Sequence, residues 1–349
     1  MTLTTTRPTT TEPSRRRAVL PLLALSLIGS CLLAISVGAY TVPVTDVVGA
    51  LWRGASADPG SVADAVILDI RAPRVALGVI VGACLAVAGV IMQGIFANPL
   101  AEPGLVGVSS GAAVGAVLAI VVGATTMVWM LPLSALAGGL AVTAGVYLLA
   151  RVDGRAEVLT LILTGVAVNA FAGAVIGLLM SVSDDAQLRS ITFWNLGSLS
   201  AATWTSVALV LPFAAVGLVT APRLARSLDL LALGERTASH LGVDLESVRR
   251  LAIVLTAVLT AAAVAVAGIV GFVGLVVPHA MRLLIGPGHR LLIPAAAMAG
   301  ATLLTLADLL ARVVVAPREI PLGVLTALIG SPVFFWLLRR EHRRRGAWA

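Results

Sequence analysis

The sequence predicts an all-α membrane protein with about ten transmembrane helices, and three observations support this. Of its 349 residues, 59% are hydrophobic, and the mean hydropathy is +1.03. Only 12% are charged, about half of the roughly 25% typical of soluble domains. The apolar residues also gather into runs of about 20 residues, the length that a helix needs to cross a bilayer.

Ten apolar runs are candidate spans, and they occupy most of the chain. They are residues 18–39, 72–95, 103–122, 127–150, 158–182, 203–221, 250–268, 270–286, 291–313 and 321–338. The cut within 250–286 is hard to place, because that stretch holds few charges. We therefore expect one transmembrane domain over 18–340. A Thr-, Pro- and Arg-rich disordered cytoplasmic tail at 1–17 precedes it, and a basic cytoplasmic tail at 341–349 follows it.

The first run resembles a signal peptide in one respect, because Arg15 to Arg17 precede it and Cys31 sits in a lipoprotein-like context. The run nevertheless stays apolar to Tyr40, which is longer than a typical signal-peptide core. This length favours a retained helix over a cleaved leader.

The distribution of arginine predicts the orientation. With the N-terminus inside and ten spans, 18 arginines fall on the cytoplasmic side, and six fall outside: Arg53, Arg71, Arg74, Arg189, Arg312 and Arg318. Positive residues concentrate on cytoplasmic loops. Both termini are therefore expected to be cytoplasmic, and the net charge of +7 is a topology signal that requires no nucleic-acid partner.

All 24 basic residues are arginine, and the chain has no lysine. It therefore lacks the lysine of a P-loop ATPase and cannot form a lysine Schiff base. Any ATP that drives this protein must be hydrolysed by another subunit. Cys31 and Cys84 both sit in apolar runs, where they indicate neither a disulfide framework nor a metal site.

The first of three polar, Gly- and Pro-rich segments surrounds the second span. It comprises Arg71 and Arg74 before the span, Gln93 near its end, and Asn98-Pro99 followed by residues up to Gly104. Two prolines and a glycine there are expected to break the helix and restart it near Pro103. An ordinary tight loop is the alternative for most of these residues.

The second segment, residues 229–243, is amphipathic and too short to span the membrane. Gly234, Ala238 and Gly242 recur every four residues, a spacing that would let a short helix dock into the groove of a partner. The alternative is a helix that lies flat at the membrane interface.

The third segment, residues 268–282, contains Gly271 and Gly274 and then Pro278-His279 in an apolar run. We expect an irregular or broken helix, which is tolerated at membrane depth only where it packs on protein or lines a water-filled cavity. His279 is more simply a hydrogen-bonded structural residue than a ligand, because no second residue has metal-site spacing.

A weak internal repeat accompanies these segments. Residues 86–89 (AVAG) recur at 265–268, and the same offset of 179 residues relates Pro99 to Pro278. The predicted topology makes the two copies run in opposite directions, as in the inverted repeats of transporters. Chance is the alternative in a chain so rich in alanine and valine.

Taken in order, six segments resemble the FecCD-type permeases of type II ABC importers, which carry iron chelates, haem or cobalamin. They are RAPR (71–74), Gln93 with NPLAEPG (98–104), LLALGERTASHLGV (230–243), GIVGFVGLVVPHAMR (268–282), ADLLAR (307–312) and EIPLGVLTALIGSPVF (319–334). The resemblance extends from about residue 66 to the C-terminus. It implies a type II ABC importer permease fold in a bacterial cytoplasmic (inner) membrane.

That resemblance also implies partners and roles. The permease pairs with a second copy, two cytoplasmic ATPase subunits that use ATP–Mg, and an extracytoplasmic substrate-binding protein. It binds no cofactor or metal and has no catalytic residue of its own. The implied site residues are the ATPase-coupling set Leu230, Leu233, Gly234, Glu235, Ala238, Leu241 and Gly242; the binding-protein docking set Arg71, Arg74 and Arg312; and the pathway set Gln93, Asn98, Pro99, Gly271, Gly274, Pro278 and His279.

The leading function is therefore import of an iron chelate, haem or a ferric siderophore, with cobalamin as the alternative. Residues 286–290 and 229–243 look most like the haem importers of the family. An ion-coupled secondary transporter is weaker, because it usually needs ionisable groups inside the membrane, and Asp308 is the only acidic residue well within an apolar run. For Arg312, pairing with Asp308 four residues earlier is the alternative to docking.

Overall fold

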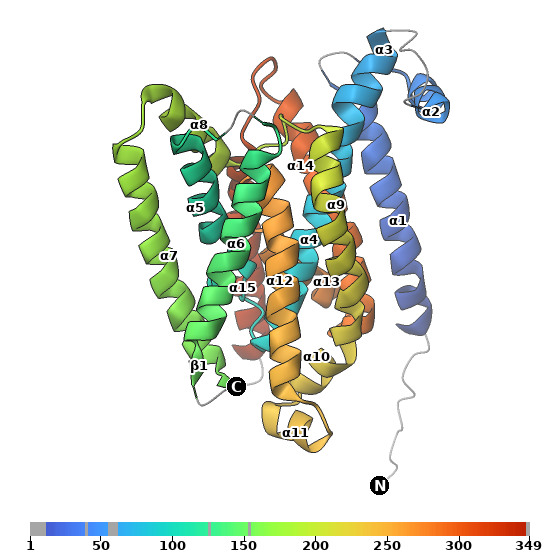
Figure 1. Ribbon diagram of the computed structural model, residues 1–349. Coiled ribbons are helices and arrows are strands. Elements are labelled where there is room, and N and C mark those ends of the chain that lie inside the picture. Colours follow the sequence, from blue (N-terminus) through green and yellow to red (C-terminus); the bar gives the residue numbers. More distant parts are fainter. Residues whose placement is uncertain (1–11, 39–40, 55–61, 125–126, 153–154, 347–349) are drawn as a thin grey trace.

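The computed structural model describes residues 12–38, 41–54, 62–124, 127–152 and 155–346. Nearly all of them are helical, and the long helices run antiparallel from one end of the molecule to the other (Figure 1). The elements are α1 (Glu12–Ser36), α2 (Val44–Arg53), α3 (Val62–Ala65), η1 (Val66–Arg71), α4 (Ala72–Ile95), η2 (Pro103–Val106), α5 (Val108–Val121), α6 (Met130–Leu149), β1 (Arg151–Val152), β2 (Arg155–Ala156), α7 (Val158–Ser181), α8 (Asp185–Leu196), α9 (Trp204–Thr220), η3 (Ala221–Leu224), α10 (Ala225–Leu231), α11 (Glu235–His240), α12 (Leu245–Ala267), α13 (Val273–Ile285), α14 (His289–Val313) and α15 (Leu322–Gly346).

The prediction of an all-helical bundle is confirmed, and each of the ten predicted spans contains an apolar helix. Within the described residues, seven helices are long and apolar enough to cross a membrane, and they contain α1, α4, α6, α7, α9, α12 and α14. The other three spans are shorter apolar helices, α5, α13 and the first part of α15. The short helix α8, between α7 and α9, was not predicted. Its start is set by a capping box, in which Asp184 accepts the backbone N–H of Gln187.

Both predicted tails are shorter than expected. Helix α1 begins at Glu12, so the last part of the tail expected at 1–17 is helical, and residues 1–11 lie outside the described residues. Similarly, α15 continues to Gly346, which makes most of the tail expected at 341–349 helical. Arginine is a good helix former, and no proline or glycine interrupts residues 339–345.

Two spans are broken. The break before α13 falls in the segment that was expected to be irregular, and the restart at Pro103 was expected too, but the break at Gly107 was not predicted. The span expected at 103–122 divides into η2 and α5 at Gly107, whose φ is +80°. The span expected at 270–286 begins late, because Gly268 and Phe272 adopt positive φ values of +66° and +67° and α13 starts only at Val273. With 14 and 13 residues, these helices are about 20 Å long, less than the roughly 30 Å of a bilayer core.

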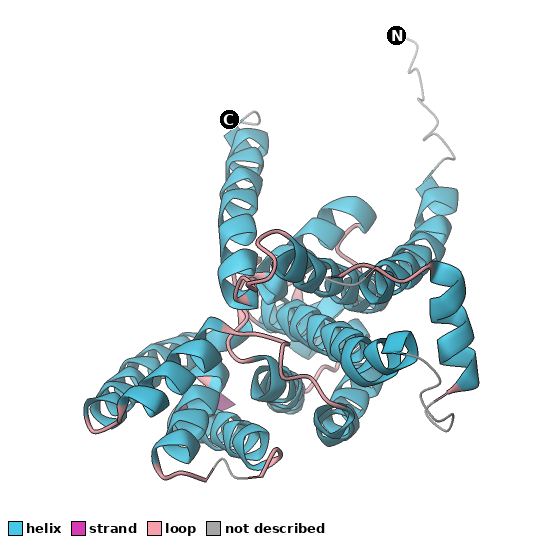
Figure 2. Cartoon of the chain, turned by 90° about the horizontal axis from the view of Figure 1, so that it is seen from above, coloured by secondary structure: helices cyan, strands magenta, loops and turns pink. Residues whose placement is uncertain are grey.

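Helix α4 forms the centre of the bundle and packs against α9, α12, α13 and α14. Glycines allow its closest contacts: a Cβ on Gly82 would lie 2.2 Å from the Gly300 carbonyl oxygen, and one on Gly89 would lie 1.8 Å from that of Gly274. Small residues permit such backbone approach between membrane helices. Helix α15, in contrast, leans away from the bundle (Figure 2).

The order of helices supports an inverted repeat. Helices α4 to α7 have 24, 14, 20 and 24 residues, and α12 to α15 have 23, 13, 25 and 25. The two sets run in opposite directions (Figure 1). The offset of 179 does not relate them, however: Pro99 lies in a loop, whereas Pro278 lies inside α13. The AVAG match is therefore the coincidence that the composition allows.

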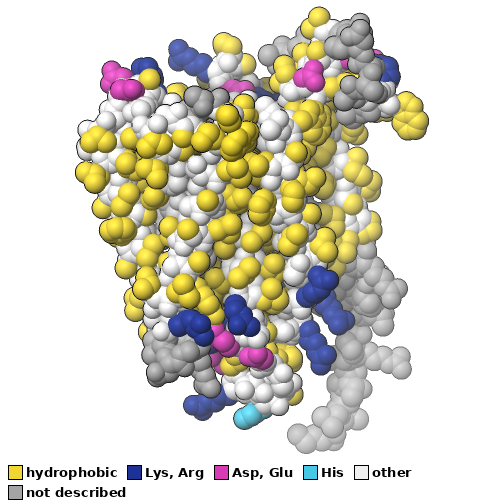
Figure 3. Space-filling model, in the orientation of Figure 1, with side chains coloured by type: hydrophobic (Ala, Val, Ile, Leu, Met, Phe, Trp, Pro, Cys, Tyr) yellow, Lys and Arg dark blue, Asp and Glu magenta, His cyan; other side chains and the backbone are white. Residues whose placement is uncertain are grey.

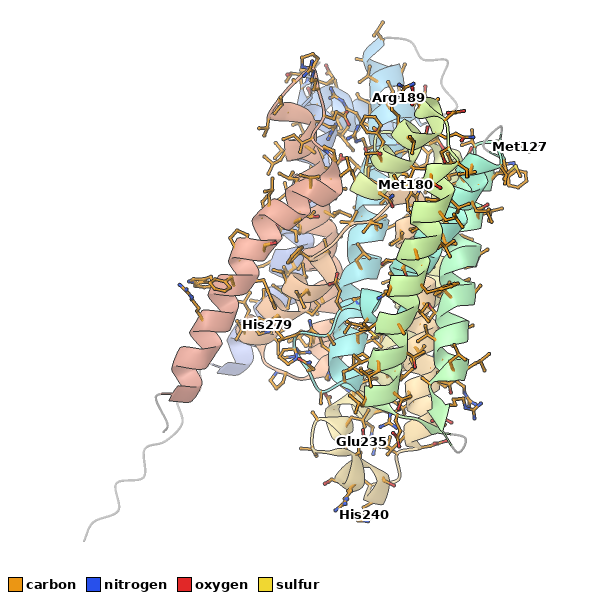
Figure 4. The ribbon with its side chains drawn as sticks, turned by 90° about the vertical axis from the view of Figure 1, so that its left-hand side faces the viewer. Met127, Met180, Arg189, Glu235, His240 and His279 are labelled. Atoms are coloured by element: carbon orange, nitrogen blue, oxygen red, sulfur yellow. The ribbon has the colours of Figure 1, made fainter. Side chains whose placement is uncertain are left out.

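The two ends of the molecule carry different features. Helix α11 lies at the end where α1 begins and α15 finishes (Figure 1). Apolar side chains cover the surface between the ends, and charged side chains gather toward both (Figure 3). Figure 4 places Glu235 and His240 at one end and Arg189 at the other. This arrangement has the relative topology that the arginine distribution predicted.

Candidate functional site

At the end opposite α11, Arg74 is the centre of a buried ion cluster. Its Nε and Nη2 atoms donate to Asp308 at 2.9–3.0 Å, and its Nη1 and Nη2 atoms donate to Glu319 at 2.9 and 2.8 Å. Arg74 is 7% exposed and Asp308 is 3% exposed, whereas the Glu319 side chain is 37% exposed. Bidentate pairs of this type are the strong, geometrically specific ones.

The neighbouring arginines fasten α1 to the bundle. The Nη1 atom of Arg71 donates to the carbonyl oxygens of Ile35 and Ser36 at 2.6 and 3.1 Å, and the Nη2 atom of Arg312 donates to that of Ala34 at 2.9 Å. These carbonyls belong to the last turn of α1, which carries the negative end of the helix dipole. Cations are favourable there, so the arginines stabilise the packing of α1 on α4 and α14.

The three predicted docking residues therefore share one cluster but present little surface. Arg71 is 4% exposed. The guanidinium groups of all three arginines donate to acceptors within this chain. The alternative for Arg312 is realised, since its Nε lies 3.3 Å from Asp308 Oδ2. Asp308 is thus neutralised by two arginines, near the end of its helix. A coupling carboxylate would have to exchange a proton or a cation, so this pairing argues against an ion-driven transporter.

In the interior, Gln93 joins α4 to α13. Its Nε2 donates to the Leu275 carbonyl oxygen at 3.2 Å, and its Oε1 accepts from Arg282 Nη1 at 2.9 Å. Pro278 lacks the N–H that the Gly274 carbonyl would accept in a regular helix, and this carbonyl lies against Gly89. The start of α13 is consequently held by α4 as well as by its own helix.

The two breaks meet inside the bundle. The backbone N–H of Phe272 donates to the Glu102 carboxylate, and a Cβ on Gly274 would lie 3.1 Å from Cδ of Pro103. Asn98, by contrast, only closes its own exposed turn, accepting from Leu100 N–H at 2.9 Å. Gly271 has open space around it. The structure therefore brings together part of the predicted pathway set, and Gly271 lies apart from it.

His279 lies between the two ends of the molecule (Figure 4) and is 7% exposed. It lines a cavity of about 340 Å³ together with Gln93, Asn98, Pro99, Arg282 and His289. Among the described residues, no three side chains of the types that hold metal ions come together.

Sequence reasoning missed Asn169, which holds the first break from α7. Its Nδ2 donates to the Gly104 carbonyl oxygen at 3.2 Å, and its Oδ1 accepts from Ser110 Oγ at 2.6 Å. The signal was an amide in the middle of an apolar run, a position where a polar side chain needs a partner.

The segment 229–243 folds as two short helices, α10 and α11, with glycine at the junctions. Gly234 and Gly242 have φ values of +101° and +85°, and a Cβ at either position would meet nothing within 4 Å. These glycines supply backbone freedom. They do not form the small-residue docking face that their spacing suggested, because α11 covers only residues 235–240. Ala238 alone of that trio packs inward and is fully buried.

Two leucines beside α11 remain uncovered. Leu233 is 63% exposed and Leu241 is 57% exposed, at the extreme end of the molecule. Leu230 is partly buried against the core. An exposed apolar pair on an otherwise polar end is the kind of surface that a partner covers.

The segment is tied firmly to two long helices. Glu235 pairs with Arg249 of α12, and the carboxylate of Asp229 accepts from the backbone N–H and Nδ1 of His289, at the start of α14, at 2.9 and 2.7 Å. Asp244 caps α12 by accepting from the backbone N–H of Ser247 at 3.3 Å, and it also accepts from the Ser247 hydroxyl at 2.6 Å. These hydrogen bonds lower the pKa of Asp244. The segment is therefore in contact with α12 through Glu235 and with α14 through Asp229.

Comparison with curated proteins identifies relatives of this chain. It is 46% identical to the hemin transport system permease protein of Yersinia pestis over 291 residues, which cover 80% of this chain and 84% of that protein. It is 44% identical to the cobalamin import system permease protein of Halobacterium salinarum over 81% of this chain and 75% of the relative. It is 40% identical to the Fe(3+) dicitrate transport system permease protein of Escherichia coli over 93% of this chain and 98% of that protein.

A solved structure and a protein-family model point to the same kind of protein as these relatives. A solved structure described as an inward-facing conformation of a metal-chelate type ABC transporter superposes with a TM-score of 0.83 and 34% identity, covering 93% of this chain and 99% of that one. Residues 25–340 match the FecCD transport family. The chain therefore belongs to the FecCD transport family of permease subunits of ABC importers.

Proposed function

We propose that this chain is the permease subunit of an ATP-driven importer and that, with a second copy, it forms the pathway for an iron chelate across a bacterial cytoplasmic membrane. One observation carries the proposal: two uncovered leucines flank α11, and its segment is anchored on both sides. Glu235 of α11 pairs with Arg249 of α12, and Asp229 of the preceding helix α10 accepts a hydrogen bond from His289 of α14. A helix so placed can receive a push from a second protein and pass it to the bundle.

The partner at α11 is an ATPase subunit, one for each copy of the permease. Because the chain has no lysine, it lacks a P-loop lysine, and ATP–Mg belongs to that partner. ATP binding there shifts the permease between two packings through differential contacts with α11. The start of α1 and the end of α15 lie at the α11 end of the molecule, which is the proposed cytoplasmic side. The opposite end receives an extracytoplasmic binding protein.

The second copy covers α7 and α15, the two helices with the largest exposed apolar side chains on that side of the bundle. These side chains are Leu159, Leu163, Val166, Phe171 and Leu178 on α7, and Leu328, Ile329, Val333, Phe335 and Trp336 on α15. Large exposed apolar side chains in this number on two helices favour a protein interface. Asn169, which holds the first break from α7, places that break next to the pathway between the copies.

Docking of the binding protein involves Arg71, Arg74 and Arg312 after a local rearrangement. Glu319 is the exposed member of their cluster, and its release from Arg74 would let a carboxylate of the binding protein take its place. This exchange conserves the number of charge pairs, so its free-energy cost is small.

Haem or a ferric siderophore is the proposed cargo, and cobalamin is the second candidate. The hemin permease and the Fe(3+) dicitrate permease support the first, whereas the cobalamin permease at 44% identity supports the second. The cargo is set mainly by the binding protein, which makes the complete importer the object to test.

The test is uptake by proteoliposomes that contain this permease and the ATPase subunit encoded with it, supplied with its binding protein. Hemin, a ferric siderophore and cyanocobalamin are offered separately, with ATP enclosed. We expect ATP-dependent uptake of an iron chelate and none with an ATPase whose P-loop lysine is replaced. Uptake that needs no ATPase and collapses with a protonophore would overturn the proposal. Uptake of cyanocobalamin alone would show that the cargo is cobalamin and not an iron chelate.

A further inference from the structure

An apolar groove lies between α6 and α12, in the half of the bundle that carries α11. Its volume is about 250 Å³, and it is lined by Leu140, Thr143, Ala144, Tyr147, Leu148, Arg250, Ile253, Val254, Ala257 and Val258. The two helices are in close contact at Gly139, where a Cβ would lie 3.1 Å from Cβ of Ala261. The groove lies on the α11 side of that contact.

The lining of the groove is nearly all hydrocarbon. Thr143 is turned back on its own helix, because its hydroxyl donates to the Gly139 carbonyl oxygen at 2.8 Å. Val254 is 51% exposed and Leu148 is 64% exposed along the rim. Since both helices are candidate membrane spans, a lipid acyl chain is the occupant that matches this surface.

The mouth of the groove is basic. Arg250 is the one charged residue of its lining, and Arg151 lies over the Tyr147 ring at 5.9 Å. Two carboxylates stand near these arginines: Glu246 accepts from the Tyr147 hydroxyl at 2.6 Å, and Asp244 accepts from Ser247 and attracts Arg250 electrostatically. The Nη2 atom of Arg250 donates to the Ser247 hydroxyl at 3.4 Å. Both carboxylates line a different cavity, beneath α11. Basic side chains also edge the apolar surface on this face (Figure 3).

We propose that this groove holds one anionic phospholipid per subunit, with an acyl chain between α6 and α12 and the phosphate at Arg250. Basic pockets between transmembrane helices on the cytoplasmic side are known to select anionic head groups. The lipid would also contact the start of α12, next to the ion pair that joins Arg249 of α12 to Glu235 of α11.

Native mass spectrometry of the purified permease tests this, with dioleoyl phosphatidylglycerol and dioleoyl phosphatidylcholine as the probes. We expect one phosphatidylglycerol per subunit to be retained preferentially. Arg250→Gln should weaken its binding about fivefold, the effect of removing one basic group near the lipid surface, while Arg250→Lys should preserve it. Arg290→Gln is the matched control, because Arg290 is exposed at the same end but outside the groove.

Filling the groove gives an independent arm. Ala144→Leu should reduce the binding of both lipids, whereas Ala141→Leu, also at an exposed position of α6 but outside the lining, should not. Equal retention of the two lipids, or no effect of Arg250→Gln and Ala144→Leu, would overturn the proposal. So would an intersubunit disulfide through Val254→Cys in a background without Cys31 and Cys84, since a second copy would then occupy the groove.

Discussion

The two ends of this permease handle their charges in opposite ways. At one end, Arg71, Arg74 and Arg312 are drawn into the protein and matched with Asp308, Glu319 and the carbonyls of α1. At the other end, α11 stands at the surface with Leu233 and Leu241 uncovered. The comparison teaches that a cluster of arginines can be used up in contacts within the chain, whereas exposed apolar residues are left available for a contact with another protein.

The largest effect is expected from Arg74→Ala, which would leave Asp308 buried with only part of its charge compensated. Breaking a buried ion pair costs about 3–5 kcal/mol, to be measured as the free energy of unfolding in detergent. Arg53→Ala is the control, because the Arg53–Asp64 pair is at the surface, with the Arg53 side chain 53% exposed, and should cost about 1 kcal/mol or less. Equal losses for both variants would mean that the cluster does not stabilise this end.

Next in size is Gly234→Ala, at the junction where φ is +101° and ψ is 146°. Only glycine adopts this region readily, so alanine should destabilise α11 by about 1–3 kcal/mol. Hydrogen exchange of the α11 amides would report the loss locally. Gly288→Ala, at a φ of −64° with equally open space, should leave exchange unchanged.

A smaller change in stability is expected from Glu319→Gln, about 1 kcal/mol or less, because this side chain is partly exposed. If Glu319 occupies the place of an incoming carboxylate, the variant should bind the binding protein more tightly, as measured by surface plasmon resonance at several salt concentrations. Glu157→Gln, an exposed change at the other end, should not alter docking. Weaker docking by Glu319→Gln would show that Glu319 supports the interface instead.

The smallest change in stability, within about 0.5 kcal/mol, is expected from Leu241→Ser. Its effect should instead be functional: ATP hydrolysis in the assembled importer continues while uptake falls, because the contact that links the two is lost. Leu284→Ser serves as the control, since this leucine of α13 is 73% exposed but lies outside α11. Normal coupling in Leu241→Ser would remove α11 from the mechanism.

Much of the fold followed from local pattern. Each predicted apolar run contains an apolar helix, and the glycines and prolines of 98–104 and 268–282 marked two regions where regular helix is interrupted. The break at Gly107 was not predicted. The ends of α1 and α15 were placed wrongly, because arginine is polar in composition yet favourable in a helix. Gly234 and Gly242 were also misassigned: spacing alone cannot distinguish a packing face from two helix junctions.

Membership of the FecCD transport family, the lack of a lysine for ATP hydrolysis and the position of the segment 229–243 were thus determined by the sequence itself. These properties depend on the identity and order of the residues, which can be read directly from the sequence. Only the tertiary structure decided that Arg74 is buried between Asp308 and Glu319, that Asn169 holds a break from another helix, and that an apolar groove lies between α6 and α12. Exposure and pairing depend on residues far apart in the chain, whose meeting is set by packing.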